Sequence, residues 1–517
     1  MRKNHHCLTA MVDLTTVSAR LLSAQSRCSA LSSTFSTPGL ATIETHYVTG
    51  GTNLPLPDVS ADCVSQFGMA GPEVSVPQNV CYASLAINTS STSTTRVNVW
   101  LPDDYNGRFF GTGTGGLSGC ELRLANAFLR YQLEFATAAT DVGHTDSTAE
   151  PFLNAPEVLR DFAWRGIHVE AVVSKQIIKA YYGTRPSYSY YSGCSMGGRQ
   201  GYQAAERFPE DFDGIIACSP GLNPANLFGW HAFISMPFRA TEPGAMSTED
   251  WTLVRNETMK QCDHLDGAVD GTISYPEDCK FDPRALLCSD TRPQDCLNTA
   301  QVDGLVQFYS DMFEPDGQFF YPHYNPGGTE QPGRIRSGVW LMDPSPDVWR
   351  YVVYSDPSWP GTDFSWTDVK AGQEKLSEMK AWTGDLRAFK KRGGKLVNTH
   401  GSEDSVRVSY TMTADVTGKR DMDNWYALYL VPGHNHCSNK GSVAKGAWKF
   451  GQLGQIPEPR AASNTSEHNI LLALVDWVEK GKQPKKLVGM TDEGETREVC
   501  RYPSRGKWVG GVWKCGS

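Results

Sequence analysis

Short apolar runs alternate with longer segments of helical spacing along much of this chain. Residues 96–101 and 135–140 have the apolar composition of buried strands, and residues 156–182 have the spacing of a helix. The alternation resumes at residues 395–399 and 425–431, and a further amphipathic helix is expected near the C-terminus, from Ser466 to Lys480. Strands that alternate with helices form a mostly parallel sheet with helices on both faces. We therefore predict an α/β fold.

The alternation weakens between residues 219 and 385. This stretch holds four cysteines, many prolines and aromatic residues, and turn signals such as Pro-Gly-Gly. We interpret residues 219–385 as one large irregular insertion. Residues 28–218 and 386–517 then form the main domain, so the length of 517 residues fits one elaborated domain better than three independent ones.

Composition and charge narrow the class of protein. The chain has 48 Lys and Arg against 57 Asp and Glu, a net charge of −9, and 40% hydrophobic residues. A nucleic-acid-binding protein carries a basic surface, and a disordered chain lacks this apolar content. We expect a sizeable core and no nucleic acid as partner. Because the sequence contains no run of about 20 apolar residues, we also expect no insertion into a membrane.

Fourteen cysteines indicate an oxidising compartment, because thiols stay reduced in the cytosol. We therefore expect a secreted, extracellular protein. Residues 1–27 make a poor signal peptide, since charged residues interrupt the apolar segment 8–24. The role of this segment stays open, and the folded part is expected to begin near Cys28. Acceptor triplets for N-glycans, which fit secretion, start at Asn88, Asn256 and Asn464.

Ser195 is the candidate nucleophile. Residues 193–197 read Gly-Cys-Ser-Met-Gly and lie between a strand-like run and a helix-like run. The G-x-S-x-G pattern holds a serine on a sharp turn with its hydroxyl exposed, and the glycines leave room for the strained backbone. The turn would also place the N–H of Met196 at a helix start, where it can donate to an oxyanion. The alternative is a glycine-rich turn that only connects two core elements.

A serine nucleophile needs a base, and the base needs an acid that orients it. In this type of fold the acid and then the base follow the serine along the chain, each on a loop after a later strand. The segments HGSED and PGHNHC both follow strand-like runs. We take Asp404 as the acid and His436 as the base. Glu403 and His434 are their local alternatives.

Two cysteines adjoin the proposed catalytic residues, because Cys194 precedes Ser195 and Cys437 follows His436. A disulfide requires Cα atoms about 4.4 to 6.8 Å apart. A bridge between Cys194 and Cys437 would therefore make Ser195 and His436 neighbours, which favours His436 over His434. The alternative is that both cysteines are ordinary buried thiols or pair elsewhere.

The constellation Cys194-Ser195, Asp404 and His436-Cys437 resembles the hallmark of the tannase and feruloyl esterase family. On the acid and base loops this chain has HGSED and GHNHCSNKG where the family tends to have HG-x-A-D and G-x-x-HC-x-G-G, so substrate contacts on these loops are not carried over. The resemblance covers nearly the whole chain from Cys28 to Cys515. It is also carried by GTGGLSGC (113–120), PEVLRDFAWRGIH (156–168), GCSMGGRQGY (193–202) and FPEDFDGI (208–215).

The resemblance implies a fold like that of the α/β-hydrolases, with the insertion as a lid over the active site of a catalytic domain. It places the second half of the oxyanion hole at the N–H of Gly116 or Leu117, where the alternative is an ordinary glycine-rich turn. It leaves Cys7 and Cys218 unpaired. The other disulfides that it implies are Cys28–Cys81, Cys63–Cys120, Cys262–Cys279, Cys288–Cys296 and Cys500–Cys515.

The loop CDHLDGAVDGTISYPEDC, residues 262–279, combines hard oxygen donors with tight turns. Calcium takes six to eight oxygen ligands in a flexible shell. The resemblance supports a structural Ca²⁺ in the lid, far from the chemistry, and a bare Asp- and Gly-rich turn is the alternative. The positions expected to hold the ion are Asp263, Asp266, Ala268, Asp270 and Thr272.

These residues and the resemblance together predict a serine carboxylic ester hydrolase that forms an acyl-enzyme and needs no organic cofactor. The expected substrates are small aromatic esters or feruloylated polysaccharide fragments of plant cell walls, with hydroxycinnamoyl esters first and galloyl esters, as for a tannase, second. A catalytically silent esterase-like binding domain and a serine peptidase are the alternatives. The lid residues that could either stack on a phenolic ring or form lid core are Trp230, Trp340, Phe364 and Trp366.

Overall fold

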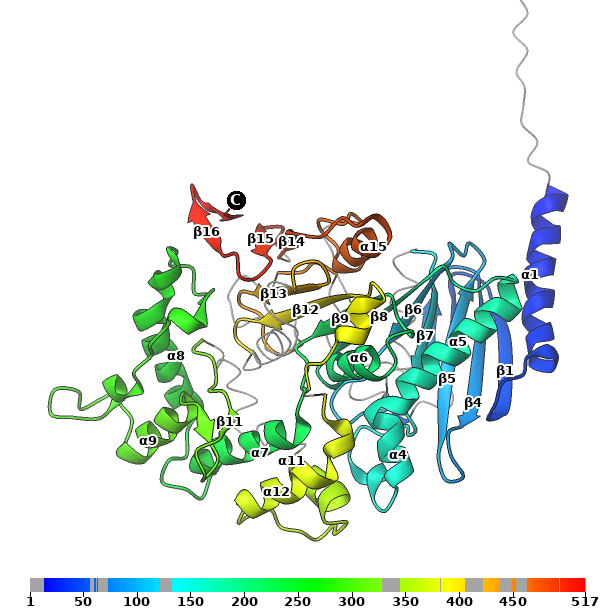
Figure 1. The fold of residues 1–517 in the computed structure, drawn as a ribbon. Coiled ribbons are helices and arrows are strands. Elements are labelled where there is room, and N and C mark those ends of the chain that lie inside the picture. Colours follow the sequence, from blue (N-terminus) through cyan, green and yellow to red (C-terminus); the bar gives the residue numbers. More distant parts are fainter. Residues whose placement is uncertain are drawn as a thin grey trace, which may run out of the picture.

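The computed structural model describes residues 14–55, 60–61, 63, 73–120, 133–327, 345–381, 383–404, 422–437, 448–451, 463–491 and 493–516. A nine-stranded sheet lies at its centre (Figure 1), in the order β1-β4-β5-β7-β6-β8-β9-β12-β13. The strands from β7 to β13 are parallel, and β1, β4 and β5 extend the sheet in antiparallel fashion. The strands are β1 (Leu40–Val48), β4 (Val80–Asn88), β5 (Thr94–Pro102), β6 (Arg108–Thr112), β7 (Ala136–Thr140), β8 (Tyr188–Cys194), β9 (Gly214–Cys218), β12 (Lys395–Gly401) and β13 (Tyr426–Val431).

The central strands are buried on both faces, which explains their continuous apolar runs. Every residue of β7 and β9 is buried. Side chains of α5 and α6 pack on one face of the sheet, and side chains of α15 pack on the other. The predicted α/β architecture is therefore the observed one. The helices of this domain are α4 (Pro156–Arg160), α5 (Gly166–Tyr182), α6 (Met196–Arg207), α13 (Arg387–Lys391) and α15 (Ile470–Lys480), with the 3-10 turn η2 (Glu150–Phe152).

Two predicted helices differ in detail from the observed ones. The helix over residues 156–182 contains a π-helical turn, η3 (Asp161–Arg165), between α4 and α5. The C-terminal helix α15 begins at Ile470 rather than at Ser466. The reason is local: the side chain of Asn469 accepts hydrogen bonds from the N–H groups of the next two residues and so caps the helix.

The packed part of the chain begins earlier than Cys28, where the sequence placed it. Helix α1 (Leu14–Thr34) runs across that position and packs against β1, β4 and α5. Ala24 is buried, and its carbonyl oxygen accepts a hydrogen bond of 3.3 Å from the hydroxyl of Tyr181. Nowhere in the described ranges is a helix long and apolar enough to cross a membrane.

The insertion forms a group of short helices to one side of the sheet (Figure 1), and we refer to this group as the lid. Its core is aromatic: Trp230 lies 4.9 Å from Tyr321 between ring centroids, and Phe364 lies 4.9 Å from Trp349. Trp366 packs against two phenylalanines, so these predicted aromatic residues are lid core, while Trp340 lies outside the described residues. The lid elements are α7 (Pro224–Ser235), η4 (Met236–Phe238), α8 (Thr248–Cys262), η5 (Asp263–Asp266), η6 (Pro276–Asp278), η7 (Pro283–Leu286), α9 (Thr299–Phe308), β10 (Met312–Phe313), β11 (Phe319–Tyr321), α11 (Ser345–Asp347), η8 (Val348–Val353), α12 (Trp366–Lys375) and η9 (Ser377–Met379).

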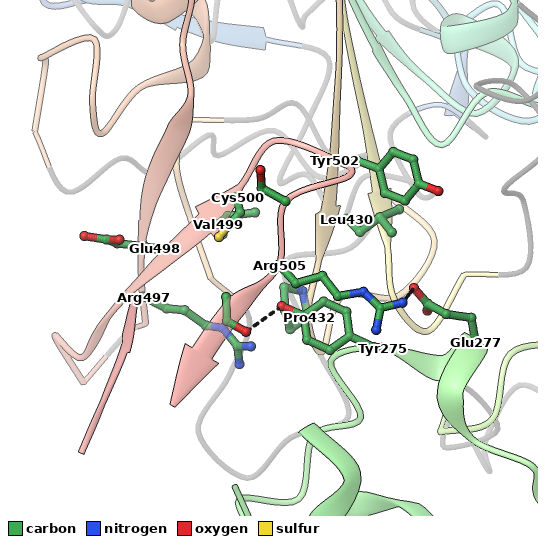
Figure 2. Close-up of a pocket in the computed structure, with 12 residues that line it drawn as sticks. Tyr275, Glu277, Leu430, Pro432, Arg497, Glu498, Val499, Cys500, Tyr502 and Arg505 are labelled. Carbon is green, nitrogen blue, oxygen red and sulfur yellow. Dashed lines mark hydrogen bonds and ion pairs between the residues drawn. The ribbon is translucent and has the colours of Figure 1, made fainter. Parts of the chain in front are cut away.

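The C-terminal segment fastens the lid to the catalytic domain. Figure 2 shows the small cavity at this junction, where Arg505 lies against Tyr275 and forms an ion pair of 2.9 Å with Glu277. The Tyr275 hydroxyl donates to the carbonyl of Gly506 at 3.0 Å, and Arg497 donates to the Ser274 hydroxyl at 2.7 Å. In the part of the chain that the structure describes, three two-stranded sheets lie outside the main sheet and the lid. They are formed by β2 (Thr52–Pro55) with β3 (Glu73–Val76), β14 (Lys486–Met490) with β15 (Thr496–Cys500), and β16 (Gly506–Val509) with β17 (Val512–Cys515).

Within the described residues six disulfides cross-link the fold, and all six pairs were predicted. Cys218 is a free, buried thiol at the end of β9, and Cys7 lies outside the described residues. The pairs are Cys28–Cys81, Cys63–Cys120, Cys194–Cys437, Cys262–Cys279, Cys288–Cys296 and Cys500–Cys515.

Candidate active site

Ser195 stands on the sharp turn between β8 and α6. Its φ of 61° and ψ of −118° lie in a region that non-glycine residues rarely adopt, as a strand-to-helix nucleophile turn requires. The flanking glycines make the turn possible. A Cβ at Gly193 would lie 2.6 Å from the Gly197 carbonyl, and a Cβ at Gly197 would lie 2.5 Å from the Thr114 carbonyl oxygen. Larger residues at either position would push the turn apart.

Asp404 and His436 follow the ends of β12 and β13, and the parallel sheet brings both to Ser195. His436 Nε2 lies 2.8 Å from Ser195 Oγ, and His436 Nδ1 lies 3.0 Å from Asp404 Oδ2. These distances allow proton transfer from serine to histidine, with the carboxylate orienting the ring. The Cys194–Cys437 disulfide, with Cα atoms 5.9 Å apart, joins the nucleophile turn to the loop that carries His436.

His434 and Glu403, the local alternatives to His436 and Asp404, interact with other groups. His434 Nε2 lies 2.7 Å from the carbonyl oxygen of Trp448, and burial lowers the pKa of His434 to about 4. Its imidazole is therefore neutral and bound to the backbone. Glu403 is buried on the acid loop, where its charge acts on Arg255 of helix α8. The geometry thus favours Asp404 and His436 as the partners of Ser195.

The acid and base loops are hydrogen-bonded to each other. The Gly433 N–H donates to the Ser402 hydroxyl at 3.0 Å, and the Glu403 N–H donates to the His434 carbonyl oxygen at 3.1 Å. A lid residue adds a further tie, because the Asn325 side chain donates to the carbonyl oxygens of the acid loop, at 3.0 and 2.6 Å. The lid therefore takes part in holding the acid in place.

Asp404 is buried but remains ionised. Burial would raise the pKa of its carboxyl, but the imidazoles of His436 and His400 outweigh burial and hold that pKa well below its ordinary value. The lid adds two tyrosines, Tyr321 and Tyr324, whose pKa values are raised by burial and by the charge of Asp404. The carboxylate thus sits in a pocket of histidine and tyrosine side chains.

The predicted oxyanion donors lie on two segments that one glutamine connects. Met196 is the first residue of α6, so its N–H has no acceptor in the preceding turn of the helix. Gly116 has a φ of 58°, with open space beside its α-carbon. Gln200 on α6 accepts from the Thr114 N–H and donates to the Thr114 hydroxyl, both at 3.0 Å. This side chain therefore sets the position of the Gly-rich loop relative to the nucleophile helix.

The acidic loop of the lid offers the donor types that calcium prefers. Asp263, Asp266 and Asp270 lie in one loop closed by the Cys262–Cys279 disulfide. Burial, and to a smaller extent the charges of Asp266 and Asp263, raise the pKa of Asp270 against the opposing charge of Arg497. The carboxylates accept hydrogen bonds from backbone N–H groups of the loop. Over the described ranges no three His, Cys, Asp or Glu side chains are gathered as a metal site of side chains alone would need. The donor chemistry fits calcium only with carbonyl ligands, such as those expected at Ala268 and Thr272, and calcium stays a prediction.

Two residues near the site were not found from the sequence. Asn325 is 79 residues from Asp404 along the chain, and no local pattern marks it. His400 lies four residues before Asp404, and its imidazole approaches the carboxylate to 3.6 Å. The only feature of the sequence that could have indicated His400 is its position at the end of a predicted strand, directly before the acid loop.

The sheet, the nucleophile turn after β8, the acid after β12 and the base after β13 define an α/β-hydrolase-like carboxylic ester hydrolase. The chain belongs to the tannase and feruloyl esterase family, whose model matches residues 81–340 and 357–517.

Relatives and solved structures agree with this assignment. A "Probable feruloyl esterase B-2" of Aspergillus flavus is 37% identical over 457 residues, which cover 86% of this chain and 85% of the relative. A relative of the same description from Aspergillus oryzae is 33% identical over 95% of both chains. The crystal structure of feruloyl esterase B from Aspergillus oryzae superposes with a TM-score of 0.87 at 32% identity, over 95% of this chain and all of that one. A tannin acyl hydrolase from Aspergillus niger shares the fold, with a TM-score of 0.70 at 19% identity over 96% of this chain and 94% of that one.

Proposed function

We propose that this protein hydrolyses hydroxycinnamoyl esters of the feruloyl type through an acyl-enzyme. The observation that carries the proposal is the unbroken contact from Ser195 through His436 to Asp404, at 2.8 and 3.0 Å. The acyl group is inferred from the relatives at 33 to 37% identity, which are described as feruloyl esterases B. Galloyl esters are the second candidate, because the family model also covers tannases.

In the first half-reaction Ser195 Oγ attacks the ester carbonyl while His436 Nε2 accepts its proton. Asp404 Oδ2 accepts a hydrogen bond from the Nδ1–H group of His436, which fixes the tautomer and stabilises the imidazolium. The N–H groups of Met196 and Gly116 are the proposed oxyanion donors. His436 then gives its proton to the departing alcohol. In the second half-reaction His436 activates a water molecule that releases the aromatic acid from Ser195.

Product chromatography with methyl ferulate, methyl caffeate and methyl gallate tests the proposal. Release of ferulate at the highest kcat/KM, and its loss in Ser195→Ala, is the expected result. Preferential release of gallate would make the protein a tannase. No release from any of the three esters, with no labelling of Ser195 by a phosphonate probe, would instead favour a catalytically silent binding domain. Hydrolysis of peptides with no hydrolysis of esters would favour a serine peptidase.

We also propose that the protein is secreted, glycosylated and active on feruloylated fragments of plant cell walls. Six disulfides support an oxidising compartment. The acceptor residues Asn88, Asn256 and Asn464 are all exposed. Expression in a fungal host should deliver the protein to the medium, and an endoglycosidase should lower its mass. Retention in the cells would contradict the secretion proposal.

A structural calcium ion in the lid is the third part of the proposal. The aspartates of loop 262–279 support it, because their carboxylates are oxygen ligands of the kind that calcium prefers. Thermal unfolding tests it. Chelation by EGTA should lower Tm, added Ca²⁺ should restore it, and Asp270→Asn should remove this response. A Tm that is the same in EGTA and in Ca²⁺ would contradict calcium binding.

A further inference from the structure

His400 is a buried histidine with an unusual lack of hydrogen-bond partners. It lies near the end of β12, with 1% of its surface exposed. Neither Nδ1 nor Nε2 has a hydrogen-bond partner within the described part of the chain. Buried polar groups are nearly always satisfied, so an unsatisfied imidazole calls for an explanation. A leucine or phenylalanine would fill the same space without leaving two ring nitrogens unpaired.

The polar group that His400 approaches is the proposed catalytic acid. Its Nδ1 lies 3.6 Å from Asp404 Oδ2, slightly beyond hydrogen-bond distance. The same oxygen lies 3.0 Å from His436 Nδ1. Two imidazoles therefore converge on one carboxylate oxygen, one from the base loop and one from strand β12. A conventional Ser-His-Asp arrangement needs only the first of them.

The backbone keeps His400 at this place. A Cβ at the next residue, Gly401, would lie 2.0 Å from the carbonyl oxygen of His434, so the end of β12 is pressed against the base loop. A shift of the backbone at this point would disturb the contact between strand β12 and the base loop. The position of His400 is set by the same contact that joins the acid loop to the base loop.

We propose that His400 is a positioning residue that acts through Asp404, as a second imidazole donor to the carboxylate that orients His436. This inference rests on the proposed function. Since a carboxylate only accepts hydrogen bonds, the working tautomer of His400 carries its proton on Nδ1. Closing the gap from 3.6 Å to about 3 Å makes this N–H a second donor to Oδ2. The donor keeps the carboxylate ionised and restricts its rotation, so that His436 is held toward Ser195.

The loss of this donor has a specific electrostatic signature. A carboxylate with one donor fewer is more basic, and it stabilises the imidazolium form of His436 more strongly. The base is then protonated, and inactive, up to a higher pH. Among the described residues, the other titratable groups around Asp404 are Glu403 on the same loop, Tyr321 and Tyr324 from the lid, and His231 from α7.

Three of these four neighbours do not change their protonation state near neutral pH. Burial raises the pKa values of both tyrosines, so their hydroxyls stay neutral. Burial, together with the charge of His436, lowers the pKa of His231 to about 3, against the opposing charge of Asp404. A change of the pH profile near neutral pH is therefore not attributed to Tyr321, Tyr324 or His231.

Leucine and asparagine provide a matched pair of substitutions, because they have nearly the same shape and only asparagine can donate. Asn Nδ2 can take the place of His Nδ1. We expect His400→Leu to lower kcat for p-nitrophenyl acetate about 10-fold, less than the roughly 10²- to 10⁴-fold contribution of the general base itself, with KM within about twofold. We also expect the acid limb of its kcat/KM profile to move to higher pH. His400→Asn should restore most of kcat and return the acid limb toward the wild type.

The control is His168→Leu, which breaks another pair with a buried acid, His168 Nδ1 with Asp211 Oδ2 at 2.8 Å, outside the site. It should leave kcat and the acid limb unchanged. Circular dichroism checks that each variant is folded. If folded His400→Leu is as active as His400→Asn, or if its acid limb does not move, the inference is wrong. An inactive wild type, or an active Ser195→Ala, would instead overturn the proposed function together with this inference.

Discussion

The Cys194–Cys437 disulfide should stabilise the fold and align the catalytic residues at the same time. The perturbation is the double variant Cys194→Ala/Cys437→Ala. In the chain-entropy account, a bridge across a sequence separation of 243 residues stabilises the folded state by about 5.5 kcal/mol at 25 °C. Unfolding of a chain of 517 residues has an entropy of about 1.1 kcal/mol/K. The ratio predicts a decrease in Tm of about 5 °C.

A second double variant, Cys288→Ala/Cys296→Ala, provides the matched control. Its bridge spans a separation of only 8 residues in the lid, so the same account gives about 2.5 kcal/mol and a decrease of about 2 °C. Differential scanning calorimetry measures both decreases. The two variants should also differ in activity. Without the first bridge His436 is no longer held beside Ser195, and a displacement of about 1 Å costs on the order of 100-fold in kcat.

Initial rates with a saturating ester measure that loss of kcat. The lid variant should keep wild-type kcat, because its disulfide does not touch Ser195, His436 or Asp404. Equal decreases of Tm in both double variants, with wild-type kcat in the Cys194→Ala/Cys437→Ala protein, would refute the reasoning. The hydrogen bonds between the acid and base loops would then be sufficient to hold the site.

Three further substitutions test the surroundings of the site. Burial raises the pKa of Glu170 well above its ordinary value, although the hydrogen bond from the Thr112 N–H opposes this shift. The folded protein therefore holds the Glu170 proton more tightly than the unfolded chain does, so the stability of the wild type falls as the pH rises above about 4.3. The Tm of Glu170→Gln relative to wild type should therefore rise from pH 5 to pH 8, and a constant difference would contradict this. Asn325→Ala should lower kcat about 10-fold by freeing the Asp404 loop, measured by initial rates, and an unchanged kcat would show that the lid contact is dispensable. Gln200→Met should lower kcat about 10-fold by loosening an oxyanion donor with KM within twofold, and a change confined to KM would contradict the positioning role.

The sequence allowed the α/β sheet and the order of the site segments to be predicted for physical reasons. Strands β8, β12 and β13 are short apolar runs, and parallel strands carry their C-terminal loops to the same edge of the sheet. The glycines around Ser195 have no room for side chains, so the nucleophile turn is encoded locally. The choice of His436 over His434 depended on the adjacent cysteine, because the local sequence treats both histidines alike.

Other features depend on contacts between distant segments and leave no local pattern. Asn325 reaches the acid loop across the lid interface, and nothing in its neighbourhood distinguishes it from a turn residue. The start of α1 before Cys28 depends on packing against β1 and α5, which a polar and weakly amphipathic segment does not reveal. His400 could be placed at a strand end, but its approach to Asp404 depends on how the acid loop folds back.

The junction in Figure 2 has a consequence for protein engineering. Tyr275 and Glu277 of the lid bind Gly506 and Arg505 near the C-terminus, more than two hundred residues away in the sequence. The lid and the C-terminal segment are therefore held together by direct contacts. A chimera that exchanges only the lid with that of a relative would break these contacts. Exchanges of substrate specificity in this scaffold therefore require transplanting the lid and the C-terminal hairpin as a pair.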